Sequence, residues 1–261
     1  MAKTALVTGA SGGIGLALAE LLAADGCDAV LVARNAARLD EIAADLEKRY
    51  GIRAYACPCD LSEPDAAAAL VCAVDALGVQ VDVLVNNAGF AYDAPFAGSD
   101  AARQRGVVQV DVMTLMELAH AFGGRMAARG EGSILNVASI AGFMPGPYMA
   151  TYYASKAFVQ SFSQALHAEL RLSGVHVTAL CPGPVRTNFW KAADAEHLLL
   201  SVLTASPRRV ARAGLRALRW NKALCIPGIL PKAAVLFTRV VPRSWLYYFV
   251  ALLQRPAKEA R

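Results

Sequence analysis

The clearest indication of the fold is a glycine-rich segment near the N-terminus, Thr8-Gly9-Ala10-Ser11-Gly12-Gly13-Ile14-Gly15. It follows an apolar run at residues 4–7 and precedes a helix-like stretch at residues 16–24. A glycine-rich turn between a strand and a helix lets the backbone approach a pyrophosphate, which the helix N-terminus then binds. This context predicts a dinucleotide site, with an ordinary strand–helix turn as the alternative. The expected contacts are Gly9, Ser11, Gly13, Ile14 and Gly15.

The rest of the chain alternates strand-like and helix-like segments. Strands are expected near residues 4–8, 28–33, 53–59, 81–86, 133–138, 176–181 and 223–227. Helices are expected near residues 13–25, 36–50, 64–77, 100–129 and 151–173. Most of these strands are continuous apolar runs, which is typical of a parallel sheet covered on both faces. The pattern predicts an α/β fold, a single-domain Rossmann-type doubly wound parallel sheet of about seven strands with helices on both faces.

Bulk composition narrows the class of protein. The 261 residues are 56% hydrophobic and 18% charged, which suits one globular domain with a substantial core. No basic segment followed by an apolar one marks a signal peptide, so we expect a cytoplasmic protein with reduced thiols. Among six cysteines only Cys57 and Cys59 lie close together, and the four histidines are scattered. We therefore expect no metal site.

Tyr152 and Lys156 form a candidate catalytic pair. Their i, i+4 spacing on a predicted helix places the ammonium beside the phenol. A nearby cation lowers a phenol pKa, which brings a proton donor toward working pH. Ser139, at the end of a strand-like run, can hydrogen-bond the same substrate oxygen. A pair on the helix surface is the alternative for such a short motif.

Three further segments follow predicted strands: Asp60-Leu61, Asn86-Asn87-Ala88-Gly89, and Pro182-Gly183-Pro184-Val185-Arg186-Thr187. With these motifs in this order, residues 3–190 resemble the short-chain dehydrogenase/reductase family. The resemblance implies that Asp60 bonds the adenine amine and that Thr187 contacts the nicotinamide end of the cofactor. It places at the cofactor Asp60, Leu61, Asn87, Ala88, Gly89, Tyr152, Lys156, Pro182, Gly183, Val185 and Thr187.

The end of the second strand indicates which nicotinamide cofactor binds. An acidic side chain about 20 residues after the glycines holds the adenosine ribose of NAD. Here Ala33 takes that place, and Arg34 follows it, with Arg38 one helical turn further on. A guanidinium binds a 2′-phosphate in a fork, whereas a carboxylate repels it. We therefore expect NADP(H), with Arg34 as the main contact; the alternative for Arg34 is a surface arginine.

One position departs from the family pattern. The family carries an asparagine in the long helix before the serine-bearing strand, where it helps a proton relay through the lysine. Asp111 takes that place here. An ionised carboxylate accepts hydrogen bonds but donates none, and it would offset part of the Lys156 charge. We count Asp111 as a candidate catalytic residue; the alternative is a side chain that caps or solvates the helix.

The substrate side is expected to be apolar. Phe143 and Tyr148 lie between Ser139 and Tyr152, and Phe189 and Trp190 follow Thr187. An apolar pocket with few polar groups suits a bulky hydrophobic ketone or alcohol. The alternative is that these side chains pack a substrate lid, expected at about residues 185–215, onto the sheet.

The C-terminal extension, residues 206–261, differs from the core at residues 1–190. It holds twelve Lys or Arg and one acid, a net charge of +11, whereas the whole chain carries +5. Its apolar stretches fall short of the ~20 residues that a spanning helix needs. We expect this extension to cover the cleft or to form a subunit interface. The alternative is peripheral contact with an anionic membrane.

The sequence thus predicts an NADP(H)-dependent oxidoreductase that interconverts a secondary alcohol and a ketone or aldehyde. Tyr152 would protonate the alkoxide, Ser139 would hold the oxygen, and Lys156 would lower the Tyr152 pKa. We expect a homo-oligomer, a dimer or tetramer, and no nucleic-acid partner. The rival prediction is a catalytically weak NADP-binding protein whose basic C-terminal region is an interaction or membrane surface.

Overall fold

A seven-stranded parallel sheet forms the centre of the protein, in the order β3-β2-β1-β4-β5-β6-β7. The computed structural model describes residues 2–187, 189 and 204–254. The strands are β1 (Thr4–Thr8), β2 (Asp28–Ala33), β3 (Ala54–Pro58), β4 (Val81–Asn86), β5 (Gly132–Val137), β6 (Val175–Leu180) and β7 (Leu224–Cys225). All six strand pairs are parallel, which confirms the predicted sheet. Two strands are shorter than expected: β3 by one residue at each end, and β7, which has two residues.

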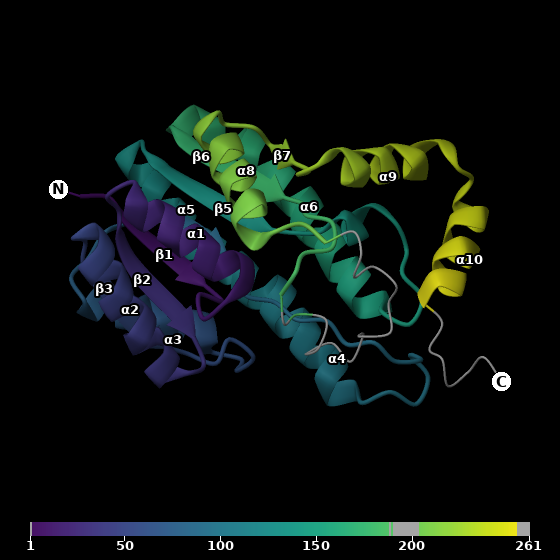
Figure 1. Ribbon diagram of the computed structural model, residues 1–261, viewed down its shortest axis with the longest axis horizontal. Coiled ribbons are helices and arrows are strands. Elements are labelled where there is room, and N and C mark those ends of the chain that lie inside the picture. Colours follow the sequence, from purple (N-terminus) through teal and green to yellow (C-terminus); the bar gives the residue numbers. More distant parts are fainter. Residues whose placement is uncertain (1, 188, 190–203, 255–261) are drawn as a thin grey trace.

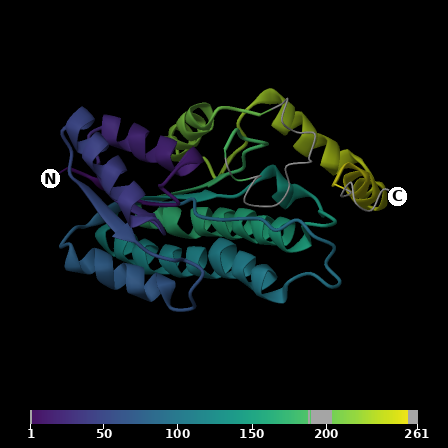
Figure 2. The ribbon, with the colours of Figure 1, turned by 60° about the horizontal axis from the view of Figure 1, so that its bottom comes forward.

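Helices cover both faces of the sheet (Figure 2). One layer contains α1 (Gly13–Ala24), α2 (Ala36–Tyr50) and α8 (Pro207–Arg219), and the other contains α3 (Ala66–Ala76), α4 (Ala101–Val108), α5 (Leu115–Arg129) and α6 (Ala150–Leu170). Each layer has its own apolar core, with Leu18 and Leu215 in the first, and Leu70 and Phe122 in the second. The doubly wound architecture is therefore confirmed.

The long helix predicted at residues 100–129 is interrupted in the structure. A π-helical turn, η1 (Gln109–Thr114), separates α4 from α5. A π turn widens the i→i+4 hydrogen-bond pattern to i→i+5, and such turns are frequent at functional sites. This turn points the carboxylate of Asp111 into the protein, where the side chain is fully buried. Asp111 therefore neither caps the helix nor faces solvent.

The chain after β7 forms two helices that the sequence patterns did not predict. They are α9 (Ile229–Val240) and α10 (Arg243–Gln254), and together we call them the C-terminal arm. Figure 1 shows that α9 extends away from the sheet beyond β7, and that α10 follows at the far end of α9 and runs in a different direction. Within the described ranges, no helix is both long and apolar enough to cross a membrane.

Candidate active site

A cavity of about 1530 Å³ lies at the carboxyl ends of the strands. Its walls come from the glycine loop after β1, from the residues that follow β2, β4, β5 and β6, and from α6 and the C-terminal arm. β1 lies between β2 and β4, so the chain reverses its direction across the sheet at this point. Such a switch point is where doubly wound sheets bind their ligands.

The glycine loop has a shape that side chains would block. Gly9 and Gly13 adopt left-handed φ angles of 66° and 58°. A Cβ atom on Gly15 would lie 2.2 Å from the carbonyl oxygen of Gly9, so this position requires glycine. Ser11 and Ile14 line the cavity, whereas Gly15 is not among its lining residues and permits the tight turn instead.

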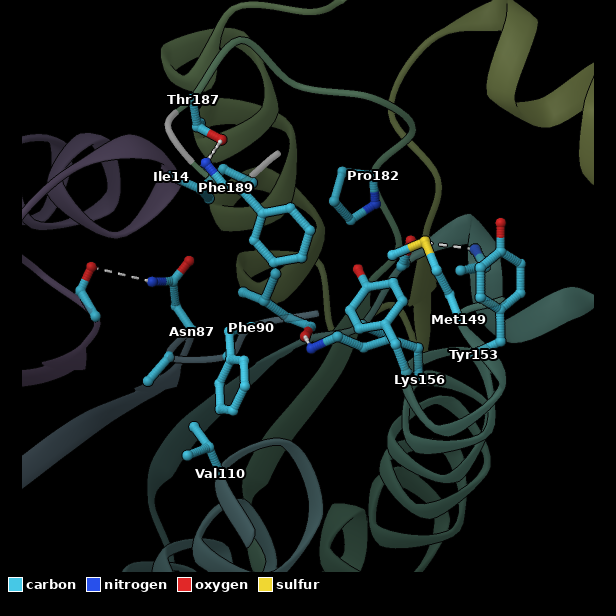
Figure 3. Close-up of a pocket in the computed structure, with 18 of the residues that line it drawn as sticks. Ile14, Asn87, Phe90, Val110, Met149, Tyr153, Lys156, Pro182, Thr187 and Phe189 are labelled. Atoms are coloured by element: carbon cyan, nitrogen blue, oxygen red, sulfur yellow. Dashed lines mark hydrogen bonds between the residues drawn. The ribbon is translucent and has the colours of Figure 1, made fainter. Parts of the chain in front are cut away.

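Asn87 holds the glycine loop in place. Its backbone N–H donates to the Thr8 hydroxyl at 2.9 Å, and its side-chain amide donates to the Thr8 carbonyl, also at 2.9 Å. Figure 3 shows Asn87 between the loop and the cavity. Asn87, Ala88 and Gly89 line the cavity, and the Asn87 side chain also supports the loop.

The end of β2 and the end of β3 form one side of the cavity. Ala33, Arg34, Asp60 and Leu61 all line it. The Asp60 carboxylate accepts hydrogen bonds from the Ser62 hydroxyl at 2.7 Å and from the Ser62 backbone N–H at 3.0 Å. These bonds, and to a smaller extent the charge of Arg34, hold the pKa of Asp60 below its usual range.

Ser139, Tyr152 and Lys156 come together at the centre of the cavity. Ser139 follows β5, and Tyr152 and Lys156 lie one turn apart on α6. The Ser139 hydroxyl oxygen accepts the backbone N–H of Ala141 at 3.1 Å. The Lys156 ammonium donates to the Val137 carbonyl at 3.2 Å and lies 5.6 Å from the centre of the Tyr152 ring.

Asp111 is the direct partner of Lys156. One carboxylate oxygen lies 2.9 Å from Lys156 Nζ, and the other accepts the Phe90 backbone N–H at 3.0 Å. Burial raises the pKa of Asp111, and the charge of Lys156 opposes that rise. A Cβ on Gly89 would lie 2.8 Å from the same carboxylate, so glycine at position 89 leaves room for it.

The pKa of Tyr152 is raised in this structure, although Lys156 lies beside the phenol ring. Burial is the largest influence, and it raises the phenol pKa because the phenolate loses its hydration. The Asp111 charge raises this pKa further, while the hydrogen bond with Ser139 lowers it. Asp111 therefore offsets the cationic help that Lys156 was expected to give.

The segment after β6 closes the opposite side of the cavity. The four residues that were predicted to contact the cofactor here all line it: Pro182, Gly183, Val185 and Thr187. The Thr187 hydroxyl accepts the backbone N–H of Phe189 at 3.3 Å (Figure 3). Residues 188 and 190–203 of the predicted lid, including Trp190, lie outside the described residues. The last part of the predicted lid belongs instead to α8, which packs in the core.

Of the predicted substrate residues, Phe189 reaches the reacting centre. Its ring lies 5.6 Å from the Tyr152 ring. Phe143 is not among the residues that line the cavity and packs against the core beside α6. Tyr148 does not line it either and takes a left-handed φ of 67° in the turn before α6.

The structure adds cavity residues that the sequence patterns missed. Tyr153 comes from the first turn of α6 (Figure 3). Met144 and Met149, in the segment between Ser139 and Tyr152 whose Phe, Met and Tyr were expected to face the cleft, line the cavity too. The C-terminal arm adds several more: Ala234, Phe237, Thr238, Leu246, Phe249, Val250, Leu252 and Gln254. The Gln254 amide donates to the Tyr153 hydroxyl and so fastens α10 to α6.

Comparison with known proteins agrees with this geometry. A family model described as short chain dehydrogenase matches residues 3–197. This chain belongs to the short-chain dehydrogenase/reductase family. Nodulation protein G of Azospirillum brasilense is 37% identical over 188 residues, which are 71% of this chain and 76% of that protein. A very-long-chain 3-oxoacyl-CoA reductase of Neurospora crassa is 34% identical over 85% of this chain and 67% of its own length. The match covers 62% of the corresponding human protein.

Solved structures of other family members show the same fold. A short-chain dehydrogenase from Sphingobium yanoikuyae in complex with NADPH is 33% identical, with a TM-score of 0.82. That match covers 92% of this chain and 96% of the other. A bulky-bulky ketone specific alcohol dehydrogenase from Comamonas testosteroni is 28% identical, with a TM-score of 0.77. This second match covers 93% of this chain and 96% of the Comamonas testosteroni chain. The protein is therefore an oxidoreductase of a family that uses nicotinamide cofactors.

Proposed function

We propose that this protein is an NADP(H)-dependent oxidoreductase that interconverts a bulky hydrophobic ketone or aldehyde with its alcohol. The observation that carries the proposal is the grouping of Ser139, Tyr152 and Lys156 in one cavity that the glycine loop also lines. One site thus holds a proton donor, an oxygen-binding hydroxyl and a dinucleotide cradle.

The residues present fit NADP(H). The α1 N-terminus and its glycine loop offer backbone N–H groups for the pyrophosphate. Arg34 is exposed on the cavity wall, where its guanidinium can bind a 2′-phosphate in a fork. Ala33 stands where an NAD-binding acid would repel that phosphate. When bound, the nicotinamide supplies or accepts the hydride.

The side chains around Tyr152 are arranged for proton transfer to a carbonyl oxygen. The raised pKa keeps the phenol protonated at neutral pH, which is the form that donates a proton during reduction. Ser139 holds the same oxygen and stabilises the charge that develops on it. Lys156, fixed by Val137 and Asp111, orients the ribose and favours the phenolate that remains.

The substrate class follows from the lining of the cavity. Met149, Phe189, Leu246 and Val250 are apolar residues of the cavity lining, and Met149 and Phe189 pack with Tyr152. A pocket of this kind binds a large apolar molecule and orients it with a few polar groups. Two relatives support the class by their descriptions, one as a very-long-chain 3-oxoacyl-CoA reductase and one as specific for bulky-bulky ketones.

The test is an NADPH-oxidation screen over ketones and aldehydes of increasing apolar bulk. Turnover should rise from small ketones to bulky ones, and it should be lost in Tyr152→Phe. Cofactor binding is measured in parallel by fluorescence. Tight NADPH binding with no turnover of any carbonyl would reject the enzyme in favour of the rival, a catalytically weak NADP-binding protein.

One observation favours that rival. The buried Asp111 carboxylate offsets the Lys156 charge that assists Tyr152, which can slow the chemical step. A homo-oligomeric state, either dimer or tetramer, and a cytoplasmic location stay predictions. Sedimentation of the purified protein tests the first, and cell fractionation tests the second.

A further inference from the structure

The helix α10 has two different faces. Leu246, Val250 and Gln254 are spaced four residues apart, are buried, and line the cavity. Trp245 and Tyr248 lie on the opposite face, where they are 72% and 70% exposed, and neither lines the cavity. The buried face of the helix therefore belongs to the active site. Phe249 and Leu252, which are 53% and 73% exposed, line the mouth of the cavity as well. Trp245 and Tyr248 form an exposed apolar surface that no element covers in the described part of the chain.

The helix α9 extends this apolar surface. Ile229, Leu236 and Val240 are spaced seven and four residues apart, which places them on one face, and all three are exposed. None of them lines the cavity. We call these three residues, with Trp245 and Tyr248, the outer face of the C-terminal arm. Large exposed apolar patches mark a surface that another molecule covers.

The positive charge around the outer face indicates which kind of partner covers it. Lys232, Arg239 and Arg243 are exposed on the arm, and residues 206–258 contain no Asp or Glu. Two copies of this face would bring like charges together, which disfavours a second copy as the partner. An anionic lipid surface offers the opposite charge, and tryptophan and tyrosine favour the depth of the lipid headgroups.

We propose that the outer face of the C-terminal arm docks on an anionic lipid bilayer. Helices α9 and α10 have 12 residues each, about 18 Å at 1.5 Å per residue, so neither can span a bilayer. Each lies in the plane of the membrane, with its apolar side chains inserted and its cations at the headgroups. The docking does not depend on the proposed enzymatic activity.

The first experiment measures co-flotation of the full chain with vesicles. The vesicles are pure phosphatidylcholine, or phosphatidylcholine with part of it replaced by phosphatidylglycerol. The wild type should float with the anionic vesicles only. Leu236→Glu with Trp245→Glu should weaken binding by at least about tenfold, because two charged groups replace inserted apolar ones. Leu172→Glu, at a residue 88% exposed outside the arm, is the matched control and should bind like the wild type.

A second set of variants tests the charge contribution. Replacing Lys232, Arg239 and Arg243 with glutamine should weaken binding to anionic vesicles and reduce its salt dependence. The matched control replaces three exposed cations outside the arm with glutamine: Lys3, Lys48 and Arg171. NADPH binding and the melting temperature are measured for every variant, so that loss of the fold is recognised.

A third measurement locates the arm in the bilayer. With Trp190→Phe and Trp220→Phe, Trp245 is the one tryptophan left of three, and brominated acyl chains should quench its fluorescence. Failure of the wild type to float with anionic vesicles would overturn the proposal, as would equal loss of binding in the control variants. A different result would assign the outer face to a second copy of the chain. In that case the wild type would be an oligomer that does not bind vesicles, and the double variant Leu236→Glu with Trp245→Glu would sediment as a monomer.

Discussion

The ion pair beneath Tyr152 joins a buried ammonium to a buried carboxylate. Asp111 is 0% exposed and Lys156 is 4% exposed, so both charges have lost most of their hydration. The attraction between such charges offsets this loss only when the geometry is good and further hydrogen bonds are made. Here the Phe90 N–H and the Val137 carbonyl supply those bonds. The ion pair therefore fixes the position of Lys156, while the Asp111 carboxylate offsets part of the electrostatic effect of the ammonium.

Asp111→Asn should shift the pH dependence of alcohol oxidation. Oxidation needs the phenolate, so its rate rises with pH through the pKa of Tyr152. The Asp111 charge raises that pKa, and an amide carries no charge. The ascending limb of the profile, on which the rate rises with pH, should therefore move to lower pH in the variant. The measurement is turnover against pH for both proteins with one alcohol; superimposable profiles would mean that Asp111 is not ionised or does not act on Tyr152.

Tyr152→Phe should lower turnover by at least ~100-fold while NADPH still binds, because only the proton donor is lost. Tyr153→Phe is the control, since its hydroxyl is engaged by Gln254 on α10. That variant should retain most of its turnover and should lose only the link between the two helices. Equal loss in both variants, measured by NADPH oxidation, would mean that the wrong tyrosine has been assigned.

At the scale of the elements, the turn from β1 into α1 depends on one close approach. In Gly15→Ala the new Cβ would meet the Gly9 carbonyl oxygen at 2.2 Å, so the turn must open. We expect a loss of about 1–3 kcal/mol in the free energy of unfolding, as for other overpacked sites. Gly12→Ala is the control, because no atom lies within 4 Å of its Cβ position. The melting temperatures of both variants are measured without cofactor. Similar melting temperatures for Gly15→Ala and Gly12→Ala would contradict the prediction.

The end of β2 should determine the cofactor preference. NADPH should bind at least about tenfold more tightly than NADH, a difference of ~1.4 kcal/mol. Arg34→Ala should reduce this preference mainly by weakening NADPH. Arg38→Ala is the control, because Arg38 is already paired with Glu41 at 2.8 Å. Fluorescence titration with both cofactors decides; equal affinities in the wild type would refute the assignment.

The sheet could be predicted because its strands are buried on both faces and read as continuous apolar runs. All seven strands agree with the predicted ranges to within a residue or two at each end, although β7 contains only Leu224 and Cys225. The glycine loop was predictable for a different reason, since its backbone geometry excludes other residues. Both signals are local in the sequence.

The missed features depend on contacts between distant segments. A π turn of six residues has no periodic pattern of its own, so the burial of Asp111 could not be read from its neighbours. The raised pKa of Tyr152 follows from its burial, which the i, i+4 spacing with Lys156 does not reveal. On α10, the buried positions Leu246, Val250 and Gln254 do show helical spacing, which was a usable signal.

At the scale of the whole molecule, the two faces of the arm should be separable by mutation. Leu246→Ser, on the inner face, should raise the KM for a bulky ketone by about tenfold or more, as expected when apolar contact is lost from a pocket. It should leave the KM for a small ketone and vesicle binding unchanged. Trp245→Ser, on the outer face, should weaken vesicle binding and leave the KM for the bulky ketone unchanged. Steady-state kinetics and flotation on the same samples make the test; a shared defect would mean that the arm acts as one unit.

The support of the glycine loop by Asn87 has a consequence for folding. Thr8 and Asn87 are 79 positions apart, so the loop is completed only after β4 has paired with β1. Contacts between such distant positions form slowly, because the long intervening chain must first lose its freedom. We therefore expect NADPH to leave the rate of early collapse unchanged in refolding experiments. It should instead slow the unfolding of molecules in which both strands are already in place.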